Sequence, residues 1–284
     1  MLENLIHFFH NRTRLFRHSK YRLQKHRKWT ALTFLIAFGL MVLTAIAFYF
    51  LDIVEVTQAT FDYRLTGLVA FGVIWVAIYI HYRFFPRDYY VTRHFNMSPF
   101  FHIVLSSGMH TIILTVLMTV MAWLKPLNTD TTWVGVFFYS AMSFVFIVIM
   151  SFLLGLVYVL YPKLDRVFTL IVILTFLLVP ILYIPPNSNG WVTHVMMLNP
   201  MYYLVNGMQQ AVIVGHEAMN HLGYHFYFMC FIGLMIVFCY ALKDYVSQLR
   251  PNEHHQSKVQ KEKKPNKPKA VKQRHLIVAH SFFV

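Results

Sequence analysis

Six apolar segments of 18 to 29 residues dominate the sequence, and none of them contains Asp, Glu, Lys or Arg. A helix rises ~1.5 Å per residue, so about 20 apolar residues are enough to cross the hydrocarbon core of a bilayer. Charged residues make up only 13% of the chain, against about 25% in an ordinary soluble domain. The sequence therefore predicts an all-α polytopic membrane protein with six transmembrane helices. The expected spans are 31–51, 65–82, 101–123, 132–160, 167–184 and 224–242.

Basic residues are distributed unevenly among the segments that join these spans. With a cytoplasmic amino terminus, 23 of the 25 Lys and Arg residues fall in cytoplasmic segments, and only Arg64 and Lys125 fall outside. Cytoplasmic loops of membrane proteins carry such an excess of basic residues. We therefore expect a multi-pass protein of the cytoplasmic membrane, with both termini in the cytoplasm.

The composition divides the chain into three parts. Residues 1–30 hold eight Lys or Arg and one acid, interleaved with apolar side chains. This pattern is typical of a basic amphipathic helix on an anionic inner leaflet, and its position next to a span disfavours nucleic acid as the partner. Residues 31–243 form the six-span domain. Residues 244–284 are rich in Lys and Pro, which predicts a basic, disordered cytoplasmic tail apart from a short apolar end at 275–284.

The segment 167–214 departs from the simple pattern of spans and loops. Pro180 lies four residues before the end of the apolar run 167–184, where it should kink or stop the helix, since proline lacks an N–H. A turn cluster follows at 185–190, and then come two apolar pieces too short to cross a membrane, 191–198 and 201–214. We expect short re-entrant helices between spans five and six, dipping into the outer leaflet where neighbouring protein satisfies their backbone.

The same segment resembles a known family. The order "VPILYIP" (179–185) and then "NPMYYLV" (199–205), with "HFNMSPFFHIVLSSGMH" (94–110) before them, is similar to the permease subunits of type-2 ABC exporters. Teichoic-acid and polysaccharide exporters are the most similar within that family. The resemblance implies a homodimer with two copies of a separate ABC ATPase subunit, moving a lipid-linked teichoic acid or polysaccharide glycopolymer.

The resemblance also implies two sets of functional residues. In the expected inner loop 83–99 a short coupling helix would dock on the ATPase; the alternative is an interfacial loop whose tyrosines belong to the membrane's aromatic belt. The first and fifth spans and the re-entrant element would line the translocation path and outer gate; the alternative for each of these residues is helix packing. The coupling residues are Arg87, Asp88, Tyr89, Tyr90 and Arg93, and the path residues are Phe34, Phe38, Phe176, Pro180, Tyr183, Asn199, Pro200 and Tyr202.

The chain departs from the family pattern at two places. The family commonly carries an acidic residue after the "NPMYYLV" motif and an Arg three positions later, whereas this chain has Asn206 and Gln209. The family often has an Arg-Asp pair in the second inner loop, and Pro162 and Lys163 stand there. A subunit with an altered substrate fits these departures, and so does a non-transport membrane anchor or assembly protein of the cell envelope.

No catalytic centre is predicted. The chain has no GxxxxGK[ST] phosphate loop, so a transporter of this kind would depend on a partner's ATPase site and is not itself an enzyme. We expect no cofactor. We also expect no metal site, because His216 and His221 are five apart, and a metalloprotease helix needs histidines four apart; the alternative is weak metal binding by these two with His225. Two further patterns each allow two interpretations. His102 and His110 share a helix face, and they either line a polar path or pack as hydrogen-bonded side chains. The small pair Ser151 and Gly155 permits a close contact between helices, either within one subunit or between subunits.

Overall fold

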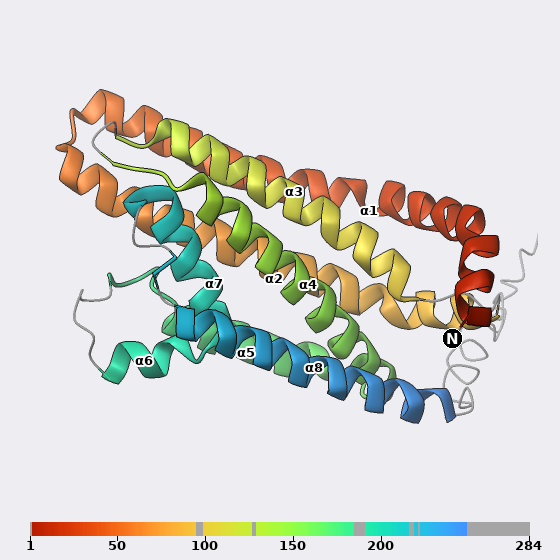
Figure 1. Cartoon of the computed structure of the whole chain (residues 1–284). Coiled ribbons are helices and arrows are strands. Elements are labelled where there is room, and N and C mark those ends of the chain that lie inside the picture. The colour runs from red at the N-terminus through yellow and green to blue at the C-terminus, as the bar shows by residue number, and fades with distance from the viewer. Residues whose placement is uncertain are drawn as a thin grey trace, which may run out of the picture. The chain divides into compact units, whose positions relative to one another are not determined.

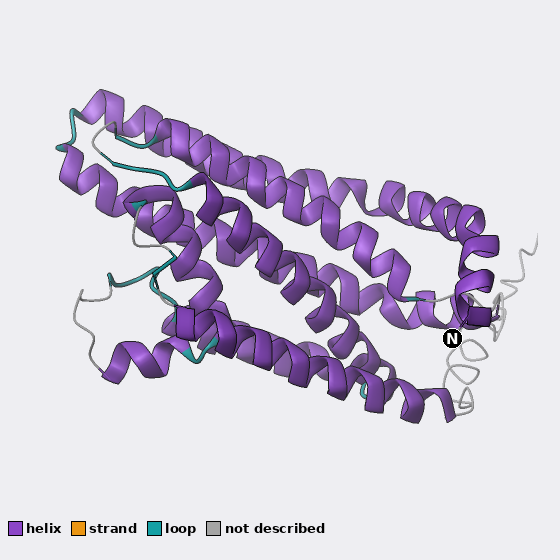
Figure 2. Ribbon diagram, in the orientation of Figure 1, coloured by secondary structure: helices purple, strands orange, loops and turns teal. Residues whose placement is uncertain are grey.

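The computed structural model describes residues 2–94, 99–126, 129–184, 191–215, 219–220 and 222–248. These residues are helical apart from short connections, with no strand among them (Figures 1 and 2). They form one compact unit up to Val246. The helices are α1 (Leu2–Leu51), α2 (Glu55–His94), α3 (Phe100–Leu124), α4 (Trp133–Leu160), α5 (Leu164–Leu178), α6 (Trp191–Met197), α7 (Pro200–Gln209), the π-helix η1 (Gln210–Val214) and α8 (Leu222–Gln248).

Five of these helices are long and apolar enough to cross a membrane: α1, α2, α3, α4 and α8. The chain is therefore a multi-pass membrane protein, as its apolar segments predict. The prediction of a sixth spanning helix over 167–184 is wrong in its extent. Helix α5 has 15 residues and ends at Leu178, which gives ~22 Å of helix.

Pro180 explains why α5 is short. Val179, the residue before the proline, has extended backbone angles, φ −87° and ψ 147°. A proline disfavours helical angles at the residue before it and cannot donate the next helical hydrogen bond. Of the two outcomes predicted for Pro180, a kink or a stop, the structure has the stop.

Two of the predicted segments are continuous with the neighbouring span. Helix α1 runs without a break from Leu2 to Leu51, so the interface segment 1–30 and the first span are parts of one helix. Helix α2 continues to His94 with Pro86 inside it, so residues 83–94 of the predicted inner loop are helical. The predicted basic tail lies outside the described residues from 249 onward.

Helix α2 is the centre of the bundle. In its most apolar window 78% of the residues are buried, against 6% for α1 and 17% for α8. It packs chiefly against α4, α3 and α7. Aromatic contacts join it to α5, where Phe168 lies 5.3 Å from Trp75 and 4.8 Å from Tyr82, ring centre to ring centre. Helices α1 and α8 consequently present most of their apolar surface outward, as lipid-facing helices do.

The small pair on α4 forms the closest part of its contact with α2. A Cβ atom added at Gly155 would lie 2.5 Å from Cγ of Phe85, and Ser151 is buried beside His81, 3.4 Å from its Nδ1. The sequence does not decide whether the small pair packs within a subunit or between subunits. In the structure the contact lies within the chain, between α2 and α4.

Substituting Gly155 with alanine should therefore destabilise the bundle. The added methyl group would displace the buried Phe85 ring, and overpacking of this kind costs about 1–3 kcal/mol, or on the order of 5 °C in Tm. Unfolding in detergent can be followed by the reaction of a thiol dye with the buried Cys239, after the exposed Cys230 has been replaced by serine. Gly72→Ala, on α2 with no atom within 4 Å of the added Cβ, is the control. Equal melting temperatures for the two variants would contradict this packing.

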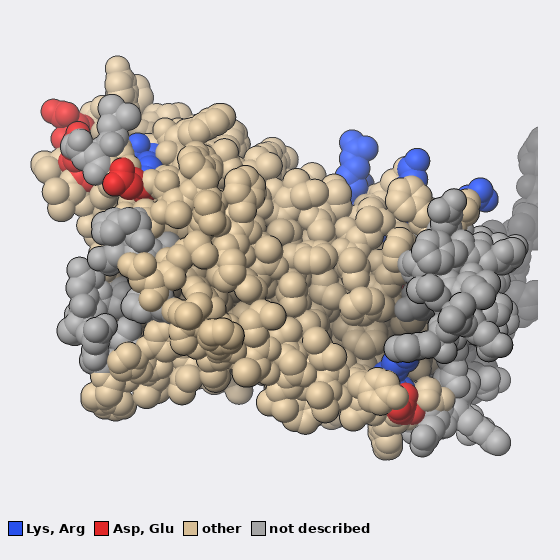
Figure 3. Space-filling view, in the orientation of Figure 1, with Lys and Arg blue, Asp and Glu red and all other residues tan. Residues whose placement is uncertain are grey.

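Charged side chains divide the bundle into two ends. On the face shown in Figure 3, acidic residues gather at one end, Lys and Arg gather chiefly at the other, and the wide band between them carries no charge. Asp52, Glu55 and Asp130 are exposed in the turns at the first end, which we name the acidic end. The opposite end, with Lys20, Lys25 and Lys163 exposed, is the basic end. A charge-free band between two charged ends is what a bilayer requires.

Candidate functional site

The broken chain between α5 and α8 is the feature of the fold that needs most explanation. The two predicted short helices are present, as α6 over Trp191–Met197 and as α7 with η1 over Pro200–Val214. Asn199 starts α7: its side-chain oxygen accepts a hydrogen bond from Met201 N at 3.1 Å, and Pro200 occupies the first turn. An Asn cap followed by proline is a favourable helix start.

Helix α7 is buried along its whole length, from Met201 to Gln209. It lies against α2 and α4 (Figure 1). A short helix with buried ends needs partners for its free backbone groups, because an unsatisfied group in an apolar medium is costly. Asn199 supplies a partner at the start of α7, and Thr131 and Thr132 supply partners at the end of η1.

Gln209 joins three parts of the chain. Its side-chain nitrogen donates one hydrogen bond to the carbonyl oxygen of Tyr63 on α2 and another to that of Pro180 beyond α5, both at 2.9 Å. Gly67 permits this approach, since a Cβ there would lie 2.2 Å from the Gln209 nitrogen. The carbonyl released where α5 stops is thus satisfied by α7.

Asn206 makes the neighbouring contact. Its side-chain oxygen accepts a hydrogen bond of 2.8 Å from the hydroxyl of Tyr63. Asn206 and Gln209 are the two positions where the resemblance leads one to expect an acid and an arginine. Here both are buried and neutral, and both bind Tyr63. They fix α7 to α2.

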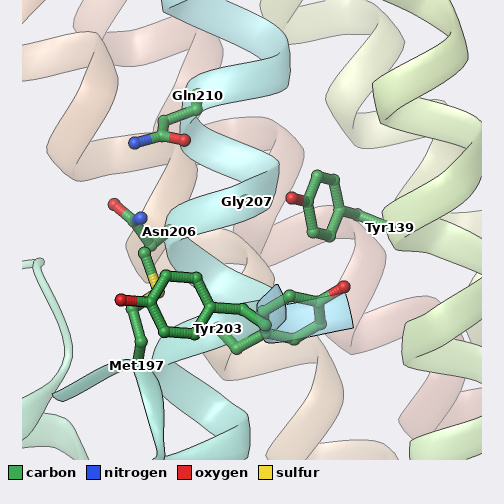
Figure 4. Close-up of a pocket in the computed structure, with 7 residues that line it drawn as sticks. Tyr139, Met197, Tyr203, Asn206, Gly207 and Gln210 are labelled. Carbon is green, nitrogen blue, oxygen red and sulfur yellow. The ribbon is translucent and has the colours of Figure 1, made fainter. Parts of the chain in front are cut away.

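A small pocket opens beside α7, between α4, α6, η1 and α8. The space between its lining atoms is about 210 Å³, a figure that includes open solvent. In Figure 4, Asn206 and Gln210 point to one side of the helix, and Tyr139 approaches Gly207 from α4. A Cβ at Gly207 would lie 2.1 Å from that ring, so only glycine permits the contact. The lining residues are Tyr139, Met197, Tyr203, Asn206, Gly207, Gln210 and Tyr224.

The far end of the broken element is tied to the loop before α4. The backbone N–H of Thr132 donates to the carbonyl of Ala211 at 2.9 Å, and the hydroxyl of Thr131 donates to that of Val212 at 2.9 Å. Gly215 then turns the chain with φ 84°, against Asp130. This contact places the end of η1 at the acidic end. Isolated turns of π-helix are frequent at functional sites.

The predicted path residues fall into two groups within the chain. Phe34 and Phe38 stack on each other on α1, with ring centres 5.7 Å apart, and α1 packs against α3 and α2. The other group surrounds the broken element. Phe176 packs on Phe71 at 5.5 Å, Pro180 and Tyr202 are buried, the Tyr183 hydroxyl donates to the Leu178 carbonyl at 2.8 Å, and Asn199 and Pro200 start α7.

The predicted coupling residues lie on the last turns of α2, at the basic end. Tyr90 is 39% exposed and Arg87 is exposed, whereas Asp88 and Tyr89 are buried. The Arg93 side chain lies outside the described part of the structure. Of the four described side chains, only Arg87 and Tyr90 are thus available to a partner, and Asp88 and Tyr89 hold α2 in the bundle.

A polar cluster inside the basic half of the bundle was not predicted as a unit. Asp88 pairs with Arg22 of α1, and its other oxygen lies 3.5 Å from Nε2 of His102 on α3. Further in, Nε2 of His81 lies 2.8 Å from the Ser106 hydroxyl. The available signal was the spacing of His102, Ser106 and His110, four residues apart on one face of α3. The complete cluster consists of Arg22, His26, His81, Asp88, His102, Ser106, Ser107, His110 and Ser151.

Metal binding finds no support in the part of the chain that is described. No group of three His, Cys, Asp or Glu side chains there is arranged to hold a metal ion. His216 and His221, the two histidines in the expected outer loop, lie outside the described residues. Their neighbour His225 contacts the hydroxyl of Tyr203 through Nδ1 at 2.5 Å.

Neither a protein-family model nor a curated protein matches the chain. The resemblance to exporter permeases therefore stays a prediction that rests on the motifs around Pro180 and Asn199.

Proposed function

We propose that this chain is the permease subunit of an ABC exporter, which moves a lipid-linked teichoic acid or polysaccharide across the cytoplasmic membrane as a homodimer with two copies of a separate ATPase. One observation carries the proposal. A broken and largely buried helical element, α7 with η1, is built into a bundle of long apolar helices. The Gln209 side chain binds two neighbouring segments, and Thr131 and Thr132 bind carbonyls of η1. Irregular backbone at membrane depth occurs where it is buried in protein or lines a path.

The distribution of charge gives the proposed orientation. Basic residues favour the cytoplasm, so the basic end faces the ATPase and the acidic end, with η1, faces outward. Nucleotide-driven movement would enter through the last turns of α2. The exit route would pass the broken element, where Tyr139, Tyr203 and Tyr224 line the pocket beside α7.

Purification of the tagged chain in mild detergent, followed by mass spectrometry of its partners, tests the proposal. The expected result is a soluble protein with a phosphate-binding loop, present in a two-plus-two complex. A lone protomer, or envelope-assembly proteins alone, would overturn the transport function.

A second function from another class is a non-transport anchor or assembly protein of the cell envelope. The contacts of Asn206 and Gln209 favour it, because both side chains are occupied in fixing α7 to α2 and leave no charged pair there. The same purification separates the two functions, since the anchor has no ATPase partner.

The substitution Tyr90→Ala tests the coupling site. Tyr90 is exposed at the basic end, and loss of an aromatic anchor at an interface costs about 1–3 kcal/mol. We therefore expect roughly tenfold or greater weakening of ATPase binding, measured by microscale thermophoresis, with unchanged thermal stability. Tyr89 is left intact, because removing its buried ring would open a cavity.

Tyr49→Ala is the matched control for Tyr90→Ala. Tyr49 is exposed at the opposite end of the bundle, in the last turn of α1. The Tyr49→Ala variant should bind the ATPase with the same affinity as the parent chain. Equal affinity of the Tyr90 variant and the parent would count against coupling through this face.

A further inference from the structure

The carboxylate of Asp88 is shared between two partners from different helices. Oδ1 pairs with the guanidinium of Arg22 on α1, and Oδ2 lies 3.5 Å from Nε2 of His102 on α3. All three side chains are buried. A buried ion pair is stable only while its charges balance, because the interior does not screen an excess charge.

Among the residues that the structure describes, the surrounding side chains add imidazoles but no second carboxylate. His26 of α1, His81 of α2 and His110 of α3 complete the titratable members of the cluster, and α4 contributes the hydroxyl of Ser151. With neutral imidazoles, Arg22 and Asp88 cancel. Each proton taken up then places an uncompensated positive charge next to Arg22.

The hydrogen bonds indicate which imidazoles are free to accept a proton. His81 uses both ring nitrogens on serine hydroxyls, with Nε2 on Ser106 at 2.8 Å and Nδ1 on Ser107 at 3.3 Å. His110 donates from Nδ1 to the Ser106 carbonyl at 3.0 Å, so its Nε2 carries the lone pair. That atom and Nε2 of His26 are buried without a hydrogen-bond partner among the described residues.

Arg22 has a short route out of the cluster. It precedes the apolar run 31–51 by nine residues, about 13 Å along a helix, at the end of the bundle where Lys20 and Lys25 are exposed. Water and lipid phosphates at that surface can solvate a guanidinium. His102, by contrast, is fixed near the start of α3, inside the bundle.

We propose that Arg22, Asp88 and His102 form an acid-sensitive latch that holds the amino-terminal part of α1 against α2. When His102 is neutral, Asp88 pairs with Arg22 and the latch is closed. When His102 takes a proton from the aqueous phase at the basic end, it becomes the counter-ion of Asp88. Arg22 then leaves for the surface, and the segment of α1 around it separates from α2. Burial disfavours the charged forms of His26 and His110, whereas the Asp88 carboxylate favours the charged form of His102. The latch does not depend on the identity of any transported substrate.

The distance between two spin labels measures the state of the latch. The labels are placed at Lys20→Cys on α1 and Lys163→Cys in the turn before α5, both exposed at the basic end. Cys230→Ser and Cys239→Ala remove the native thiols. At pH 7.5 the full chain in lipid nanodiscs should give one narrow distance distribution. At pH 5.0 the mean distance should increase and the distribution broaden, and both should recover when the pH returns to 7.5.

Three substitutions decide between the latch and a general effect of acid. His102→Gln cannot take a charge and should keep the pH 7.5 distance at pH 5.0. Asp88→Asn should give the longer distance at both pH values. His194→Gln, at an exposed histidine on α6, should respond like the parent. No shift in the parent chain, or the same shift in the His102→Gln chain, would overturn the proposal, even if the Asp88 variant failed to fold.

Discussion

The substitution Asp88→Leu is expected to destabilise the bundle by about 3–5 kcal/mol, because the buried Arg22 guanidinium loses its carboxylate. Arg22 must then either stay unpaired inside the bundle or leave it and open the contact of α1 with α2. In the Cys239 unfolding assay this corresponds to a loss on the order of 10 °C in Tm. Arg22→Met should cost less than Asp88→Leu. The remaining carboxylate keeps its contact with His102 at 3.5 Å, and it can be neutralised by a proton.

The double variant, Arg22→Met with Asp88→Leu, should be more stable than the Asp88 single variant. Both charges are then absent, and well-packed apolar side chains often replace a buried ion pair without loss of stability. A coupling free energy above about 2 kcal/mol in the double-mutant cycle is the expected result. Additive effects of the two substitutions would show that the pair is not desolvated in the folded protein.

Hydrophobic patterning predicts the helices of this chain well, because charge-free runs such as 31–51 and 132–160 can only be satisfied as helices in a bilayer. Local backbone chemistry also predicts where helices start and stop. Pro180 stops α5 and Asn199-Pro200 starts α7, as the residue types require. These signals lie within a few residues of the feature that they specify.

Predictions fail where distant partners decide the structure. Residues 83–94 combine charges, aromatic side chains and Pro86, which is the composition of a loop. They remain helical, with Asp88 bound to Arg22, 66 residues away in the sequence. The family comparison at Asn206 and Gln209 identified two unusual positions but could not identify Tyr63 as their common partner, 143 and 146 residues away. A single sequence contains no record of such pairings.

Helix α2 connects the two polar regions of the molecule. Tyr63 and Gly67 near its first turns receive α7, and Asp88 near its last turns binds α1 and α3. It is also the most buried of the long helices. A change in the Asp88 contacts can reach the broken element by moving α2 as a body, because α7 packs against α2. Release of α1 alone leaves the other helices in place.

The substitution Gln209→Glu is expected to detach α7 from its two neighbours. A carboxylate would face the carbonyl oxygens of Tyr63 and Pro180, to which the Gln209 nitrogen now donates at 2.9 Å. Two buried carbonyls would lose their donor, at about 1–3 kcal/mol each, and the charge would be buried without a partner. The total loss should be on the order of 5 kcal/mol, larger than for Gln209→Leu, which removes the donor without adding a charge.

Hydrogen–deuterium exchange localises this effect. In the Gln209→Glu chain, backbone amides of α7 and of residues 179–184 should exchange at least tenfold faster, while those of α3 and α4 keep their protection. The matched control is Gln210→Glu, at the next residue, whose half-buried side chain lines the pocket beside α7 and does not hold α5 to α2. If both variants exchange alike in α7, the hydrogen bonds of Gln209 are not what fixes the broken element. Its position must then depend on the packing of Gly207 against Tyr139.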